Sequence, residues 1–149
     1  MNIEIIDVTE KNRQEILALQ IGESQKSFVE SNEQSLKDAE ACKAFRPVGL
    51  YRDGELVGFA MYGYFQNEGE DLRVWLDRYL IDERFQGHGL GKIMLEVLLT
   101  HIEKIYKCKK IYLSVYKENQ VAVRLYETFG FHFTGEVETE GERVMVKVL

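Results

Sequence analysis

Three glycines at alternate positions, Gly87, Gly89 and Gly91, stand directly before a run with helical apolar spacing in RFQGHGLGKIMLEVLL, residues 84–99. The first N–H groups of a helix lack intrahelical partners and lie at the positive end of the helix dipole, so this position favours an anion. Glycine lets the backbone approach that anion without an intervening Cβ atom. The segment therefore predicts a site for a phosphate-bearing ligand.

Two common phosphate-binding motifs do not fit this spacing. A dinucleotide fingerprint, GxGxxG, needs its third glycine where the chain has Lys92 or Met94. A P-loop needs glycine where the chain has Gln86, and serine or threonine where it has Ile93. Both interpretations fail, so the ligand is a different phosphate compound.

The elements that must position this loop can be predicted from periodicity and turn residues. Strands are expected at residues 2–8, in two runs within 48–65 joined by Asp53-Gly54, at 72–82, at 110–116, and as two strands around Glu140-Gly141. Helices are expected from Thr9 to about Leu19, after the Ser31–Gln34 capping pattern, after the glycines with Met94, Leu95, Leu98, Ile102 and Ile105 on one face, and between Asn119 and Gly130. This order predicts an α/β (α+β) fold with a mixed, mostly antiparallel sheet of about seven strands flanked by about four helices.

The remaining loop pattern, Gln86-x-x-Gly89-x-Gly91, resembles the pyrophosphate loop of the GCN5-related N-acetyltransferases, the GNAT family, which reads Arg/Gln-x-x-Gly-x-Gly/Ala. A second pattern of that family, Asn-x-x-Ala-x-x-x-Tyr-x-x-x-Gly-Phe, is matched by Asn119, Ala122, Tyr126, Gly130 and Phe131. The predicted element order is also that of the family. The resemblance thus covers nearly the whole chain and implies one GNAT domain over residues 1–149.

The resemblance implies acetyl-CoA as the cofactor. It places the pyrophosphate on backbone amides of the glycine loop, and the pantetheine arm along residues 79–81 in a splay beside residues 110–116. A backbone N–H of Leu80 or Ile81 is expected to polarise the thioester carbonyl. The expected cofactor-binding residues are Tyr79, Leu80, Ile81, Gln86, Gly87, His88, Gly89, Leu90, Gly91, Lys92, Asn119, Ala122 and Tyr126.

Two residues are expected to be catalytic. Tyr126 matches the family tyrosine that protonates the departing thiolate; without the resemblance it reads as a core aromatic. Asp77 aligns with the position where many relatives carry a glutamate base. Because aspartate is one methylene shorter, a water relay or a purely electrostatic role is favoured over direct proton abstraction. The alternative for Asp77 is a surface carboxylate paired with Arg78 or Arg73.

The stretches RPVGLY, LVGFAMYG, RVWLDR and YKCKKIYLS resemble bacterial spermine/spermidine N-acetyltransferases of the Blt type. This resemblance implies acetyl transfer to a primary amine of a polyamine by direct attack in a ternary complex. Two alternatives stay open: acetylation of another amine, such as a protein N-terminus, an amino sugar or a diamine, and a non-catalytic module that senses coenzyme A. The expected substrate-binding residues, in a groove between the first two helices and the central strands, are Phe28, Glu30, Glu33, Trp75, Asp77 and Tyr79.

Composition agrees with a cationic substrate. A net charge of −6 over 149 residues argues against nucleic acid or anionic membrane as partner, because both select basic faces. The sequence starts with strand-like alternation instead of a signal peptide, and its two cysteines form no CxxC pair, which predicts a cytoplasmic protein. His101 and His132 have no metal-ligand spacing, so no metal is expected. The sequence is compatible with a homodimer.

Overall fold

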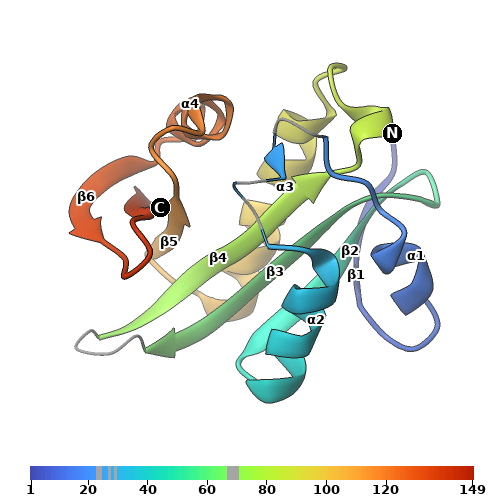
Figure 1. Cartoon of the computed structure of the whole chain (residues 1–149), viewed down its shortest axis with the longest axis horizontal. Coiled ribbons are helices and arrows are strands. Elements are labelled where there is room, and N and C mark those ends of the chain that lie inside the picture. Colours follow the sequence, from blue (N-terminus) through green and yellow to red (C-terminus); the bar gives the residue numbers. More distant parts are fainter. Residues whose placement is uncertain (23–24, 27, 29, 67–70) are drawn as a thin grey trace.

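A computed structural model describes residues 1–22, 25, 26, 28, 30–66 and 71–149. In this part of the chain, seven strands form one sheet in the order β1-β2-β3-β4-β5-β7-β6 (Figure 1). The strands are β1 (Ile3–Asp7), β2 (Phe45–Arg52), β3 (Glu55–Gln66), β4 (Leu72–Ile81), β5 (Lys110–Val115), β6 (His132–Val137) and β7 (Arg143–Val148). The helices are α1 (Arg13–Leu17), α2 (Asn32–Ala41), the short 3₁₀ helix η2 (Glu83–Phe85), α3 (Leu90–Tyr106) and α4 (Gln120–Thr128).

Neighbouring strands are antiparallel except β4 and β5, which are parallel. A parallel pair needs a crossover connection, and α3 supplies it between these two strands. The predicted mixed, mostly antiparallel architecture is therefore confirmed.

Helices cover both faces of the sheet. In β3, Phe59 and Met61 belong to a buried cluster with residues of α1 and α2, whereas Ala60 and Tyr62 belong to the cluster formed with α3. Figure 1 shows α1 and α2 in front of the sheet and α3 behind it. The alternation of side chains along a strand thus divides the core into two layers.

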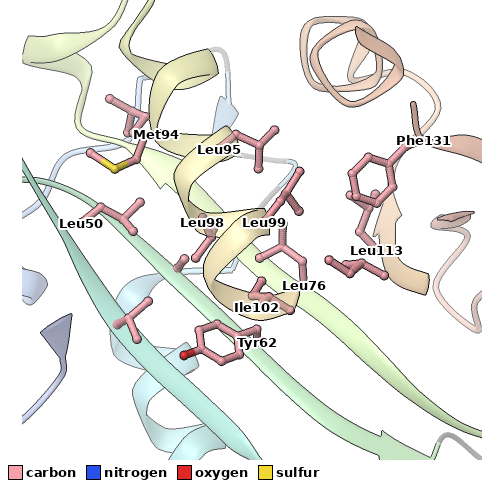
Figure 2. Close-up of a cluster of buried hydrophobic side chains, with 14 of the residues drawn as sticks. Leu50, Tyr62, Leu76, Met94, Leu95, Leu98, Leu99, Ile102, Leu113 and Phe131 are labelled. Carbon is pink, nitrogen blue, oxygen red and sulfur yellow. The ribbon is translucent and has the colours of Figure 1, made fainter. Parts of the chain in front are cut away.

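Helix α3 carries most of the predicted apolar face. Met94, Leu95, Leu98 and Ile102 are fully buried, and Figure 2 shows them packed against the sheet. Burying each such side chain contributes about 1.5–3 kcal/mol. The inclusion of Ile105 in this face was wrong: it is exposed in the last turn of the helix. No helix in the described ranges is both long and apolar enough to cross a bilayer.

The predicted hairpin turn and the helix caps at Ser31 and Asn119 are confirmed. Asp53 and Gly54 have φ values of 50° and 82°, the left-handed pair that a tight hairpin requires. The side chain of Ser31 accepts from the N–H of Gln34 at the start of α2. The side chain of Asn119 likewise accepts from the N–H of Ala122 at the start of α4.

The predicted helix from Thr9 to Leu19 is shorter in the structure. Helix α1 spans Arg13–Leu17, and Asn12 is its N-cap. Thr9 does not cap it; its hydroxyl accepts from the N–H of Lys11 in the preceding turn. This local side chain–backbone bond competes with helix formation over residues 9–12.

Candidate active site

The sheet opens between its two parallel strands. In the described chain, β4 and β5 are paired at a single position, Trp75 with Tyr112, near the start of β4. Further along, a cavity of about 330 Å³ is lined by Leu76 to Leu80 of β4 and by Leu113 to Val115 of β5. Leu76 and Leu113 belong to the core cluster on the α3 side of this opening, as Figure 2 shows. The structure thus contains a splay of the kind expected from the resemblance.

A β-bulge places Asp77 at this opening. On β3, Met61 is opposite Arg78 and Tyr62 is opposite Leu76, so Asp77 is the extra residue of β4. A bulge disrupts the alternation of the strand and re-aims the side chains around it. Leu76 packs in the α3 layer, and after the bulge Tyr79 packs in the same layer.

The carboxylate of Asp77 is in an unusual environment. Its Oδ2 atom is buried and has no hydrogen-bond partner among the described residues. Burial raises the pKa of Asp77 to about 7, Arg78 opposes this rise, and Glu138 and Glu142 add to it. The carboxylate is therefore poised to change its protonation state near neutral pH.

The alternative interpretation of Asp77 as an ion-paired surface residue is wrong. Arg78 donates to the backbone carbonyl of Asp77 at 2.8 Å, while its Nε donates to the hydroxyl of Ser35 at 3.1 Å. Arg73 is bound instead to Glu136 at 2.8 Å. Both guanidinium groups that the sequence offered as partners are thus directed elsewhere.

Tyr126 lies where the cavity between the strands meets a second cavity. This second cavity, of about 410 Å³, is lined by the ends of β4 and α4 and by the glycine loop. Burial raises the pKa of Tyr126, so its phenol stays protonated at neutral pH. The two cavities share five lining residues: Gln25, Tyr79, Leu80, Ala122 and Tyr126. A ligand in the second cavity can therefore extend to the first.

The glycine loop leaves its backbone accessible. Gly87 and Gly89 have φ values of 85° and 77°, and a Cβ atom at either position would meet nothing within 4 Å. Gly89 is also the N-cap of α3, where it offers no side chain to the first N–H groups of the helix. These open amides at a helix N-terminus fit a phosphate group.

Two hydrogen bonds between described residues hold this loop against the end of β4, and a third group, the carboxylate of Asp82, is fixed directly after the strand. The hydroxyl of Tyr79 donates to the carbonyl of Gly91 at 2.5 Å, and Nε2 of Gln86 donates to the carbonyl of Ile81 at 2.8 Å. The buried carboxylate of Asp82 accepts from the N–H of Gln20 at 2.8 Å and from Arg84. Burial opposes the ionisation of Asp82, but these hydrogen bonds outweigh it and lower its pKa.

The hydrogen bond of the residue after β4 shows which backbone groups at the end of this strand face the opening. The N–H of Asp82 donates to Val57 of β3, so the carbonyl of Ile81, trans across the same peptide bond, lies on the opposite edge. In an extended strand, the N–H and C=O of one residue share an edge. We therefore expect the N–H of Ile81, rather than that of Leu80, to face the opening toward β5.

The structure brings most of the predicted cofactor residues together. The second cavity is lined by Tyr79, Leu80, Ile81, Gln86, Gly87, Gly91, Ala122 and Tyr126, and Asn119 lines the first cavity. The remaining loop residues, His88, Gly89, Leu90 and Lys92, do not line either cavity. The side chain of Leu90 is buried in the α3 core, while His88 and Lys92 are exposed.

The predicted substrate residues are divided among three places. Phe28, Glu30, Asp77 and Tyr79 line the cavity between the strands. Trp75 lines an adjoining cavity of about 380 Å³. Glu33 is not at either place: it is exposed on α2, 3.5 Å from Lys37, because the helix turns this side chain to solvent.

Sequence reasoning missed the acidic wall of the adjoining cavity. Three carboxylates from the end of β6 and the turn before β7 line it: Glu138, Glu140 and Glu142. Burial raises the pKa of Glu142; Arg78 opposes this, whereas Glu138, Glu140 and Glu30 increase it. The alternating glutamates in ETEGE, residues 138–142, are a signal for a hairpin that presents several carboxylates together.

Aromatic rings lie beside these carboxylates. Phe45, Phe65 and Trp75 line the same adjoining cavity. The rings of Phe65 and Trp75 are stacked with centroids 6.4 Å apart. Carboxylates with aromatic faces form an environment that stabilises an organic cation.

Comparison with known proteins agrees with this geometry. Residues 13–131 match the Acetyltransferase (GNAT) family. The chain belongs to this family. It is also 53% identical over 152 residues, with full coverage of both chains, to the spermine/spermidine N(1)-acetyltransferase of Bacillus subtilis strain 168.

Solved structures of GNAT proteins share the fold. The spermidine N-acetyltransferase from Vibrio cholerae, in complex with CoA and spermine, gives a TM-score of 0.70 at 20% identity, covering 97% of this chain and 92% of that one. An aminoglycoside acetyltransferase in complex with coenzyme A gives a TM-score of 0.76 at 18% identity, covering 99% and 95%. In the present chain, the GNAT fold places the glycine loop, the opening between β4 and β5, and Tyr126 around connected cavities.

Proposed function

We propose that this GNAT enzyme transfers an acetyl group from acetyl-CoA to a primary amine of spermine or spermidine, by direct attack in a ternary complex. The observation that carries the proposal is the continuity of three cavities. The second cavity, beside the glycine loop, shares Tyr126 with the first cavity. The first cavity and the acidic cavity share five lining residues: Asp77, Arg78, Ser114, Glu140 and Glu142. The full-length identity to a spermine/spermidine acetyltransferase supports this substrate class.

The residues of the second cavity fit acetyl-CoA, which supplies an acetyl group activated as a thioester when bound. The open amides of residues 87–92 bind the pyrophosphate at the N-terminus of α3. The exposed edge of β4 near Ile81 binds the pantetheine arm, and its N–H polarises the thioester carbonyl. Asn119, buried at the start of α4, orients the arm from the other side of the opening.

Asp77 deprotonates the substrate. An alkyl ammonium has a pKa near 10.4, so freeing the amine at pH 7.4 costs roughly 4 kcal/mol. A carboxylate with a raised pKa of about 7 first attracts the cation and then accepts its proton at Oδ2, directly or through water. Its Oδ2 is buried and has no hydrogen-bond partner among the described residues, so none of their groups competes with the amine for this atom.

Tyr126 protonates the leaving sulfur. Its residue lines both the cofactor cavity and the cavity between the strands, so it is placed where the two ligands meet. Burial raises the pKa of its phenol, which therefore stays protonated at neutral pH and can give its proton to the departing sulfur. The second proton lost by the acylated nitrogen then restores the phenol.

The acidic cavity accommodates the remaining ammonium groups of the polyamine. Glu138, Glu140 and Glu142 supply negative charge there, and the stacked Phe65 and Trp75 supply apolar surface for methylene segments. A monoamine has no further ammonium group to place in the acidic cavity. The enzyme is therefore expected to prefer longer polycations.

A kinetic panel tests the function. Thiol release from acetyl-CoA is measured with spermine, spermidine, putrescine, an aminoglycoside and a peptide with a free N-terminus. Spermine and spermidine should give the highest kcat/KM. Faster turnover of the peptide or the aminoglycoside contradicts the polyamine assignment, and cofactor binding without turnover of any amine favours a coenzyme A sensor. The cytoplasmic location and a homodimer stay predictions.

A further inference from the structure

Asn32 has a buried oxygen without a partner. It is the first residue of α2 and is 7% exposed. Its Nδ2 donates to the backbone carbonyl of Ile16 in α1 at 2.9 Å, whereas its Oδ1 has no hydrogen-bond partner among the described residues. Native proteins rarely leave such an atom unsatisfied, so this oxygen requires an explanation.

The orientation of this amide is determined by its neighbour. If the two ends of the amide were exchanged, Oδ1 would face the carbonyl of Ile16, and two acceptors would be in contact. The free atom of Asn32 is therefore an acceptor. Asn32 lines the same cavity as Asp77, whose free Oδ2 is also an acceptor.

Helix α2 places Asn32 close to the bulge of β4. Residues three apart lie on the same face of a helix, so Asn32 shares a face with Ser35. The hydroxyl of Ser35 accepts from Nε of Arg78, the residue directly after Asp77. Nε1 of Trp75 is the third buried side-chain polar atom that lacks a partner among the residues described. It is a donor, and Trp75 lines the adjoining cavity. Among the described residues, two that line the cavity between the strands thus carry a buried acceptor without a partner, and a ligand with several N–H groups would satisfy both.

We propose that Asn32 is a substrate-binding residue whose Oδ1 accepts a hydrogen bond from the amine that becomes acetylated, alongside Oδ2 of Asp77. This inference rests on the proposed function. A primary ammonium offers three N–H donors, enough for both oxygens. When one N–H bond breaks and its proton bonds to Asp77, the electron pair stays on nitrogen and two N–H bonds remain. The amide oxygen of Asn32 is not basic, so it holds one of these N–H groups without competing for the proton, and it orients the lone pair.

Two substitutions separate substrate binding by Oδ1 of Asn32 from the structural hydrogen bond that its Nδ2 makes to Ile16. Asn32→Ala and Asn32→Asp both remove the Nδ2 donor to Ile16, but only Asn32→Ala removes the oxygen acceptor. The control is Asn12→Ala. Asn12 is another buried asparagine, and its Nδ2 donates to the carbonyl of Asp7 at 3.2 Å. It does not line the cavity between the strands, the second cavity or the acidic cavity.

The measurements are kcat/KM for the amine that the wild-type enzyme acetylates best, KM for acetyl-CoA, and the thermal unfolding midpoint. We expect Asn32→Ala to lower kcat/KM for the amine about 10- to 100-fold with KM for acetyl-CoA unchanged, since a hydrogen bond to a charged group is lost. Asn32→Asp keeps an acceptor but places a carboxylate oxygen opposite the carbonyl of Ile16, so it should lower the unfolding midpoint and still keep more of the amine kcat/KM than Asn32→Ala. Asn12→Ala should lower only the unfolding midpoint.

Equal losses of amine kcat/KM in Asn32→Ala and Asn32→Asp, or no loss in Asn32→Ala, would overturn the proposal. If Asn32→Ala does not fold, Asn32→Leu, which has a similar shape without polar atoms, takes its place in the same comparison. Absence of amine acetylation by the wild-type enzyme would instead contradict the proposed function, so the two failures are distinguishable.

Discussion

Asp77 and Arg78 are adjacent on β4, yet Oδ2 of Asp77 is buried with no partner in the described part of the chain, while the guanidinium of Arg78 extends to Asp38 of α2, 3.7 Å away. The bulge at Asp77 separates the two side chains. The acid is thus left available to a substrate instead of being neutralised by its neighbour. The predictions below begin with this residue.

Asp77→Asn should lower kcat by about 100- to 10,000-fold, because the proton acceptor is removed. In the wild-type enzyme, kcat/KM should rise with pH through about 7, since Asp77 must be ionised to attract the ammonium group and accept its proton. The pH profile of kcat/KM checks this. A variant that keeps both the turnover and the inflection near pH 7 would contradict the role of Asp77.

The same substitution should stabilise the fold at alkaline pH. The pKa of Asp77 is about 7 in the folded protein against 3.8 as an ordinary value, so ionisation opposes folding, and stability falls as pH rises between these values. Asn carries no charge, so Asp77→Asn should gain up to about 4 kcal/mol above pH 7 and nothing below pH 4. Urea unfolding at pH 4 and pH 8 measures the difference. A loss of stability at pH 8 would rule out this account.

Tyr126→Phe should lower kcat about 10- to 1000-fold with little change in the affinity for coenzyme A, because only the proton donor is removed. Tyr112→Phe, on β5 outside the cavities, is the matched control. Steady-state kinetics and calorimetric titration with coenzyme A check both variants. Unchanged turnover in Tyr126→Phe would remove its role as an acid.

Gly87→Ala should weaken binding of coenzyme A by about tenfold or more, since a Cβ is added where the backbone must approach the pyrophosphate. Gly87 also has a φ of 85°, so the substitution carries a strain cost of about 1–2 kcal/mol. Gly135→Ala on β6 shares this cost, because Gly135 has a φ of 95° and also meets nothing within 4 Å. Calorimetric affinity and unfolding of both variants separate the effects: equal loss of affinity would show that strain alone is responsible.

The triple substitution Glu138→Gln, Glu140→Gln and Glu142→Gln should raise KM for spermine about tenfold or more and should raise it less for butylamine. Each carboxylate contributes about 0.5–1 kcal/mol to holding a cation near the surface, and a monoamine lacks the distal charges. The effect on spermine should shrink at high salt.

The control for this prediction changes net charge equally at exposed positions: Glu33→Gln, Glu40→Gln and Glu96→Gln. It should leave the ratio of the two KM values unchanged. If both triple variants raise KM for spermine alike, long-range attraction by the net charge, and not the acidic cavity, explains the preference.

The sequence by itself determined the features that act within a few residues. The Asp53-Gly54 turn, the caps at Ser31 and Asn119, and the glycine loop before α3 depend on backbone preferences and on bonds between near neighbours. Residue types therefore predicted them where they occur. Thr9 was the exception, because its hydroxyl had a competing local partner.

Only the tertiary structure decided what meets at the site. The bulge at Asp77 arises from the register between β3 and β4, and the acidic wall arises because the hairpin after β6 folds back beside the opening in the sheet. Helix α2 turns Asn32 toward the cavity and Glu33 toward solvent. These relations join residues that are far apart in the chain. Burial, strand register and the pKa of each carboxyl group depend on such distant neighbours, so the local sequence does not predict them.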